Sequence, residues 1–448
     1  MPQEFSLGEF LAQAQRSMGG GMFGRIQGPL SGYLFGPDFF RKATYLAISD
    51  TFTATYGKKV WDALNNRTVF WNAIKKVDWG PTVGWRLRSA RFQTATSSGP
   101  VTESGDLPTI DVSQYRAVFS YPRTVATTFG VSLQAQAVSG LEGGIGNQLA
   151  VEQEAKMRDH IKEIQQELLL SGSTIVSTGG ASTTGAVAQG EYLRVGDTFG
   201  ESTAGDDAQT ITAISAAGVL TFTGGYTLTD GAIVYVKSRG GFSSLDDIIE
   251  EDGRTIAGVT VTNGPDVYNQ ATRTANGYAA GAVILDNNGT ARDISISLVD
   301  QAIRESRING GEPKLMLTGF DQYDKFAQLL QPQQRFVDFA DYVVGVGDER
   351  TYPGTQVGMQ LATYKGIPIL PDPDCAKGVN ASDADLGCHF YVLDTDYLEI
   401  AVMYPTQYIE NRDYFAAGKL VQRGLFFTMA ELRSLRMDVH SKITDLNA

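Results

Sequence analysis

The two cysteines of the chain, Cys375 and Cys388, enclose a loop rich in carboxylates, a combination that could form a disulfide or bind a cation. Three interpretations are open: two free buried thiols, a disulfide that forms after release from the cell, or a cation clip. The clip would use four aspartates: Asp383 and Asp385 within this loop, and Asp372 and Asp374 just before Cys375. Zinc is not favoured, because only His389 lies nearby and no paired C-x-x-C is present. We favour free thiols, with the disulfide second.

Residues that could act in catalysis are scarce. The three histidines are far apart in the sequence: His160, His389 and His440. No G-x-S-x-G elbow, H-E-x-x-H helix or P-loop is present. The glycine-rich run 143–146 is not a dinucleotide loop, because no buried strand precedes it. We expect His160, within a predicted helix, to be a packed or surface residue rather than a base. The chain is therefore predicted to be no enzyme, with no catalytic residue, metal or cofactor.

Charged residues are arranged along a segment from Val83 to Gly130. On its outgoing half Arg86 and Arg88 share one face at period two, and Arg91 follows just beyond. Acidic residues gather at its tip and return: Glu103, Asp106 and Asp111. If subunits dock head to tail, one acidic tip could meet a neighbour's basic surface and fix the register, each rim pair adding only about 0–1 kcal/mol. Alternatively, the charges keep an exposed ribbon soluble and discourage edge pairing.

The same segment alternates polar and apolar residues on the way out and on the way back, around a Gly/Ser/Pro tip. Such alternation indicates two extended strands. The ribbon has no obvious core of its own, and a two-stranded hairpin is marginal by itself in water. We therefore expect it to lie on a neighbouring copy of the chain. Assembly, rather than catalysis, becomes the first hypothesis.

Composition narrows the class of protein. The 448 residues are 42% apolar and 19% charged, enough for a large core in two or three domains. A net charge of -13 argues against a protein that coats duplex DNA. Basic residues of the N-terminal arm could face packaged DNA, but its acidic residues nearly offset them, so this contact would be weak and non-specific. We expect no membrane span, because no stretch approaches the roughly 20 apolar residues of one. We expect no secretory signal, because the N-terminus has no basic segment followed by an apolar run. The expected place of folding is a cytoplasm.

The expected elements are mixed α and β. We predict an irregular arm over residues 1–40, a helix over 41–66 and a longer helix over about 145–170. Between 173 and 240 four short strand candidates indicate a small inserted β-barrel or sandwich, with low-complexity disorder as the rival interpretation. Those candidates are 192–197, 209–214, 219–223 and 232–236. From 293 onward helices alternate with strands. We predict helices over 296–308 and 321–330, strands over 315–318 and 390–393, a turn feeding a strand over 364–370, and later β segments over 398–404 and 424–435.

Several runs in the second half resemble motifs of one family. These are a helix with a Gly-Gly stop and a strand entry (300–313), Gln334-Arg335-Phe336, a Y-x-G-I-P strand (364–373) and the strand that follows it (391–400). With the arm, ribbon and long helix before them, they resemble the major capsid protein of tailed double-stranded DNA viruses. The resemblance covers about residues 45–435. It implies an α+β, Hong Kong 97-like fold.

The family order implies this division of the chain: N-terminal arm (1–40), helix and lead-in (41–82), extended loop (83–130), spine helix of the peripheral domain (131–172), inserted β-rich module (173–240), peripheral return (241–283), axial domain (284–404) and closing strands (405–448). The implied function is self-assembly as hexamers and pentamers into an icosahedral shell around packaged double-stranded DNA. The extended loop would lie over an adjacent subunit.

Two family features are altered. Some members cross-link a loop lysine to a neighbour's asparagine, but no lysine lies between Lys76 and Lys156, so the shell would be held non-covalently. Some members carry a long helical scaffolding segment, which about 40 Gly-rich residues cannot be, so a separate scaffolding protein is expected. A portal and a decoration or cement protein are further expected partners. The alternatives are another virion or surface-layer subunit, such as a tail-tube protein, and a hydrolase with an unrecognised site.

Overall fold

The computed structural model describes residues 64, 67–81, 84–90, 101–107, 112–139, 147–171, 173–175, 193–201, 205–214, 220–222, 233–249, 255–256, 259–260, 283–287, 290–330, 363–378, 386–411 and 420–448. Three predictions lie outside these ranges: the arm over 1–40, almost all of the helix over 41–66, and the motif at 334–336. No helix among the described residues is long and apolar enough to cross a membrane.

The chain divides into two compact units. The first comprises Met1–Leu64, Thr128–Lys156 and Ile409–Leu425, and the second comprises Asn65–Thr127, Met157–Tyr408 and Phe426–Ala448. In the first unit the N–H of Leu133 donates to the carbonyl of Leu420 at 3.1 Å. The side chain of Gln422 donates to Glu410 in the same unit. These units differ from the eight segments expected from the sequence, and that division stays a prediction.

A six-stranded sheet carries the α/β part of the second unit, in the order β12-β19-β16-β13-β15-β14. Its strands are β12 (Val283–Leu285), β13 (Leu315–Thr318), β14 (Thr363–Tyr364), β15 (Ile367–Pro371), β16 (Phe390–Leu393) and β19 (Ser441–Ile443). Strand β13 is parallel to β15 and antiparallel to β16. All four residues of β13 are buried, which agrees with the buried strand predicted at this place.

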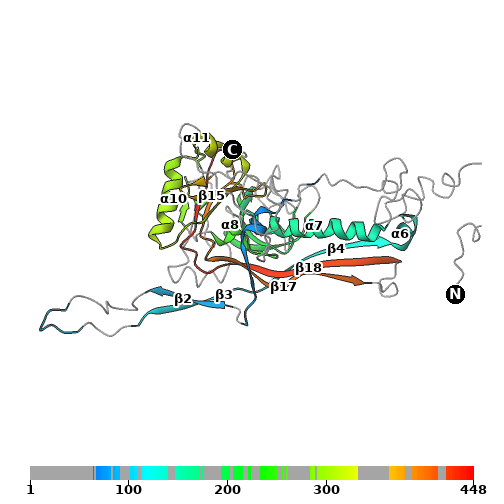
Figure 1. Ribbon diagram of the computed structural model, residues 1–448, viewed down its shortest axis with the longest axis horizontal. Coiled ribbons are helices and arrows are strands. Elements are labelled where there is room, and N and C mark those ends of the chain that lie inside the picture. Colours follow the sequence, from blue (N-terminus) through cyan, green and yellow to red (C-terminus); the bar gives the residue numbers. More distant parts are fainter. Residues whose placement is uncertain are drawn as a thin grey trace, which may run out of the picture. The chain divides into compact units, whose positions relative to one another are not determined.

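Helices α10 (Ile296–Ile308) and α11 (Phe320–Leu330) pack beside this sheet (Figure 1). Helix α10 begins where the Ser295 hydroxyl accepts from the N–H of Leu298, and it ends before Gly310, whose φ is +84°. A serine cap and a left-handed glycine are ordinary helix boundaries. Val299 and Ile303 of α10 and Phe326 of α11 enter a buried core with Met316. Each such buried side chain contributes roughly 1.5–3 kcal/mol.

The opposite side of β13 belongs to the largest core. Leu315 and Leu317 pack there with Ile164 and Leu168 of α7 (Gln148–Leu169). Helix α7 is the predicted long helix, and it is slightly shorter at both ends than expected. A four-stranded sheet in the order β1-β17-β18-β4 also contributes residues to this core. Its strands are β1 (Lys75–Asp78), β4 (Arg123–Ser132), β17 (Leu398–Asn411) and β18 (Val421–Ser434).

The remaining elements of the described residues, apart from the sheet and the hairpin described below, are short. They are α5 (Val69–Ala73), α6 (Leu133–Ser139), α8 (Leu245–Ile248) and the paired strands β10 (Thr255–Ile256) and β11 (Val259–Thr260). Phe70 of α5 is fully buried in the largest core. Strands β17 and β18, with 14 residues each, are longer than the β segments predicted at 398–404 and 424–435.

A five-stranded sheet in the order β5-β9-β6-β7-β8 occupies the segment predicted to be an inserted β module. Its strands are β5 (Ser173–Ile175), β6 (Thr198–Glu201), β7 (Gly205–Ile214), β8 (Leu220–Phe222) and β9 (Ile233–Ser238). The predicted strand over 192–197 is wrong. Residues 194–197 form a turn, because the Asp197 carboxylate accepts from the N–H of Arg194 and Gly196 adopts a φ of +95°. The strand follows instead at β6.

Candidate assembly surface

The ribbon is a hairpin of β2 (Gly84–Ala90) and β3 (Gln114–Phe119), paired antiparallel. Its register places Arg86 opposite Ala117 and Arg88 opposite Tyr115. Because successive side chains of a strand point to opposite faces, these four residues share one face. Trp85, Leu87 and Val118 belong to the other face. This register confirms the prediction that Arg86 and Arg88 share one face of the strand.

The second face of the hairpin packs on the chain's own core. Val118 is 1% exposed, and Trp85 and Leu87 pack against the largest core. The indole N–H of Trp85 donates to the carbonyl of Leu435 at 3.2 Å, and the guanidinium of Arg433 lies 6.0 Å from the Trp85 ring. The ribbon was expected to have no core of its own. This expectation is wrong for the base of the ribbon, which is the hairpin of β2 and β3. Large aromatic and aliphatic side chains on one face of the base bind it to its subunit and direct the other face outward.

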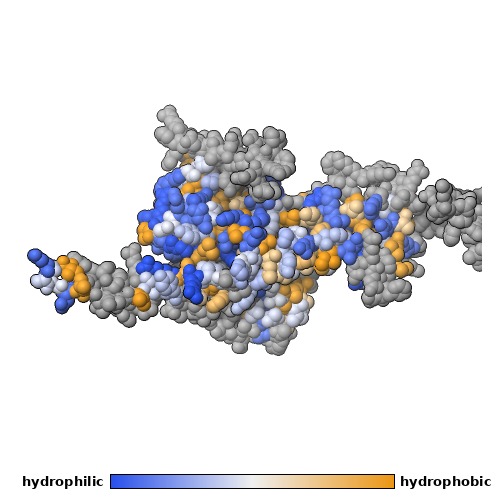
Figure 2. Space-filling view, turned by 60° about the horizontal axis from the view of Figure 1, so that its bottom comes forward, coloured by the Kyte–Doolittle hydropathy of each residue, from blue (hydrophilic) through white to orange (hydrophobic). Residues whose placement is uncertain are grey.

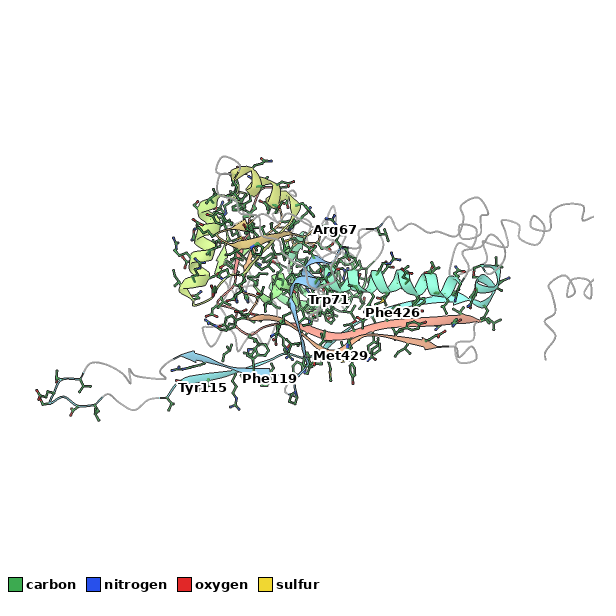
Figure 3. The ribbon with its side chains drawn as sticks, in the orientation of Figure 1. Arg67, Trp71, Tyr115, Phe119, Phe426 and Met429 are labelled. Atoms are coloured by element: carbon green, nitrogen blue, oxygen red, sulfur yellow. The ribbon has the colours of Figure 1, made fainter. Side chains whose placement is uncertain are left out.

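The outward face is hollowed. A cavity of about 520 Å³ is lined by Arg86, Arg88, Tyr115 and Ala117. Tyr115 is 65% exposed, and Figure 3 shows it on β3 together with Phe119. Within the described part of the chain neither arginine of this face has an ion-pair partner. We call these four residues the arginine face. Charge and spacing in the sequence pointed to the arginines but not to Tyr115, although the alternation of β3 places this ring on their side.

Acidic residues occupy the other described part of the ribbon, the turn 101–107. The N–H of Gly105 donates to the carbonyl of Thr102 at 2.9 Å, and all seven residues are exposed. Glu103 and Asp106 lie on it beside Val101 and Leu107, so the turn combines charged and apolar side chains at the left end of Figure 2. The predicted site residues Arg91 and Asp111 lie outside the described residues.

Strand β4, which follows the hairpin, contributes Arg123 to a cluster of charged groups that we call the ionic junction. Arg123 of β4 donates to the carbonyls of Arg239 (2.9 Å) and Gly241 (2.8 Å) and lies 3.6 Å from the Glu431 carboxylate. Glu431 accepts from the N–H of Ser243 at 3.1 Å, and Glu167 of α7 accepts from the N–H of Phe242. Burial raises the pKa of both carboxyl groups to about 7. For each carboxyl group, burial destabilises the charged form by more than its hydrogen bonds and the nearby arginines stabilise it.

Two further buried carboxylates, those of Asp197 and Asp247, bind Arg239 of the same segment. The guanidinium of Arg239 lies 2.8 Å from Asp197 and 2.6 Å from Asp247, and it donates to the carbonyl of Ser171. All three side chains are at most 1% exposed. The junction thus ties the exit of the five-stranded sheet to α7 and α8. No sequence motif predicts the ionic junction, because its partners are far apart in the chain.

The cysteine loop is part of the interior. Cys375 and Cys388 are both buried and free, and burial raises the pKa of the Cys375 thiol. Of the cation-clip residues, Asp372 accepts from Gln165 at 2.5 Å and Asp374 pairs with Lys162. Asp383 and Asp385 lie outside the described residues. In the described ranges no group of three or more His, Cys, Asp or Glu is placed to hold a metal. His160 is a packed residue, bonded to Thr127 (2.9 Å) and Thr428 (2.8 Å).

The comparisons with known proteins concern most of the chain. A family model described as the SU10 major capsid protein matches residues 47–424. A chain from the capsid asymmetric unit of cyanophage A-1(L) has a similar fold, with 13% identity, a TM-score of 0.52, and coverage of 88% of this chain and 96% of that chain. None of the curated protein sequences matches.

Two further solved structures are less similar. The holo-SrpI encapsulin complex from Synechococcus elongatus PCC 7942 gives 9% identity, a TM-score of 0.41, and coverage of 88% of this chain and 94% of that chain. The capsid of an empty GTA particle gives 9% identity, a TM-score of 0.43 and the same two coverages.

Proposed function

Because this chain belongs to the SU10 major capsid protein family, we propose that it assembles as hexamers and pentamers into an icosahedral head that encloses packaged double-stranded DNA. Membership makes it a structural capsid protein of the tailed-phage type. The proposed role is non-enzymatic, and the proposed setting is assembly in the host cytoplasm followed by residence in the virion.

The observation that supports assembly is the two-sided hairpin. One face of its base is buried in the subunit, while the arginine face and the turn 101–107 are exposed. A hairpin that continues beyond its own core is marginal unless something else covers it. In the proposed shell an adjacent subunit supplies that cover.

The proposed shell is held without covalent cross-links between subunits. No lysine lies on the ribbon, so it has no amine with which to form a cross-link. Contacts of the hairpin type are heterologous, since one surface meets a different surface of the next copy, and such contacts form closed rings when the rotation between copies closes. Individually weak contacts suffice because each subunit has many neighbours.

The finer assignments belong to the same proposal. The six-stranded sheet with α10 and α11 would form the axial domain, and α7 with the four-stranded sheet would form the peripheral domain. The five-stranded sheet, with its own buried cluster around Phe199, would be an inserted module that closes into a barrel or sandwich. A separate scaffolding protein, a portal and a decoration protein would complete the particle.

Electron microscopy of the expressed chain tests this function. Purified material should contain closed, megadalton icosahedral particles, and size-exclusion chromatography should separate them from free subunits. Deletion of residues 93–109 should abolish the particles while leaving a subunit with unchanged circular dichroism. Open tubes or flat lattices would favour a tail-tube or surface-layer subunit instead, and a stable monomer would contradict assembly altogether.

A further inference from the structure

We propose that the arginine face binds the acidic turn 101–107 of a second copy of this chain. The inference rests on the proposed function and names the partner of the hairpin within it. Arg86, Arg88 and Tyr115 line the receiving hollow, and Glu103 and Asp106 are the charged groups that would enter it.

The chemistry of the hollow selects carboxylates. Two guanidinium groups lie two positions apart on one face of a strand, about 7 Å along it. Each can bind a carboxylate through two parallel hydrogen bonds. Elsewhere in the described structure, the arginines at the ionic junction already hold carboxylates, as Arg239 does with Asp197 and Asp247. The two arginines of the hairpin have no such partner among the described residues, and the exposed ring of Tyr115 borders them.

The turn has matching features. Its two carboxylates are three positions apart on a loop closed by the Gly105–Thr102 hydrogen bond, so they are presented together. Leu107 is 85% exposed and Val101 is 45% exposed, which leaves apolar surface to be covered beside the charges. The hollow of about 520 Å³ has room for a short peptide segment of this kind.

A second copy is the partner that fits this arrangement. In Figure 1 the turn lies beyond the outer ends of β2 and β3. Every copy therefore carries a basic hollow on its hairpin and an acidic turn at the tip, and neither has an ion-pair partner among the described residues. Pairing the tip of one copy with the base of the next uses both, and the contact is heterologous, as a ring requires.

Charge reversal with rescue tests the pairing. The base variant is Arg86→Glu with Arg88→Glu, the turn variant is Glu103→Arg with Asp106→Arg, and a third chain carries all four changes. Each of the first two should raise the subunit concentration needed for shell formation about tenfold at low salt, because like charges then meet. The four-change chain should return to within about threefold of the unaltered chain. High salt should shrink these differences, since exposed charge pairs are screened.

A matched control separates charge from shape. Arg86→Lys with Arg88→Lys keeps both charges and loses the planar fork, so its effect should be smaller than that of the base variant. Circular dichroism of each variant must match the unaltered chain. If the base variant fails to assemble but the turn variant assembles normally, the hollow binds another acidic surface and the pairing is wrong. It is also wrong if the four-change chain is not rescued. Absence of shells from the unaltered chain would overturn the proposed function and the pairing with it, whereas normal shells from every variant would overturn only the pairing.

Discussion

The Nζ atom of Lys442 lies 2.8 Å from Oδ1 of Asp246, and the two side chains are 0% and 2% exposed. The hydroxyl of Tyr391 donates to the same carboxylate oxygen at 2.7 Å. This network joins β19, α8 and β16 inside the second unit. A buried ion pair costs about as much to desolvate as it returns, but loss of one partner leaves an uncompensated charge.

We expect Lys442→Met to lower the free energy of unfolding by about 3–5 kcal/mol, because Asp246 then remains buried without its cation. Urea denaturation of unassembled subunits measures the loss. The double variant Lys442→Met with Asp246→Leu should lose less than the single variant, since no unpaired charge remains. As a control, Lys314→Met removes an exposed partner of Asp396 and should change little. Equal losses for the single and double variants would contradict this account.

The buried carboxyls Glu167 and Glu431 should make stability depend on pH. Burial raises both folded-state pKa values from 4.5 to about 7, so the folded chain binds protons that the unfolded chain has released. The stability that these two groups contribute is therefore greatest below about pH 4.5, falls as the pH rises towards 7, and is lost above it. Each group contributes on the order of a few kcal/mol to this fall.

Urea midpoints at pH 5 and pH 7.5 measure the effect for Glu167 and Glu431. Glu431→Gln should flatten part of the slope, because a neutral amide has no charge to desolvate. A variant with the same pH dependence as the unaltered chain would show that Glu431 titrates normally.

Local sequence signals predicted the α/β elements well. The bounds of α10 follow from the serine at 295 and the glycines after 309, and β13 follows from a continuous apolar run. These signals act over a few residues, so one sequence suffices to detect them. The strand expected over 192–197 failed for a related reason. Its apolar residues alternate as in a strand, but Gly196 and Asp197 favour a turn, and the structure has a turn there.

The candidate site divides in the same way. The shared face of Arg86 and Arg88 follows from the period of a strand, so the sequence predicted it. The buried junction did not follow, because Arg239 meets Asp197 across 42 positions and Glu431 meets Ser243 across 188. Contacts of that separation depend on how sheets and helices pack, and no periodicity in one sequence records them.

Arg239→Met should be among the most destabilising single substitutions in the described part of the chain. It leaves Asp197 and Asp247 buried without their shared cation and removes the donor to Ser171. A loss of about 3–5 kcal/mol in the free energy of unfolding is expected. Arg304→Met, which removes an exposed pair with Glu305 at 3.2 Å, is the matched control and should cost about 1 kcal/mol or less. Similar losses for the two variants would argue against a special role for the junction.

Cys375 and Cys388 should react as buried free thiols. Both are almost inaccessible, at 2% and 5% exposure, and burial raises the pKa of Cys375, so little of its reactive thiolate forms at neutral pH. Iodoacetamide should therefore modify neither cysteine in the native chain and both after denaturation without reductant, as read by mass spectrometry. A sample that is denatured with reductant and then treated with iodoacetamide gives the reference signal for two modified thiols. If only that reduced sample is modified, the cysteines are paired, and the disulfide interpretation of the loop replaces the free thiols.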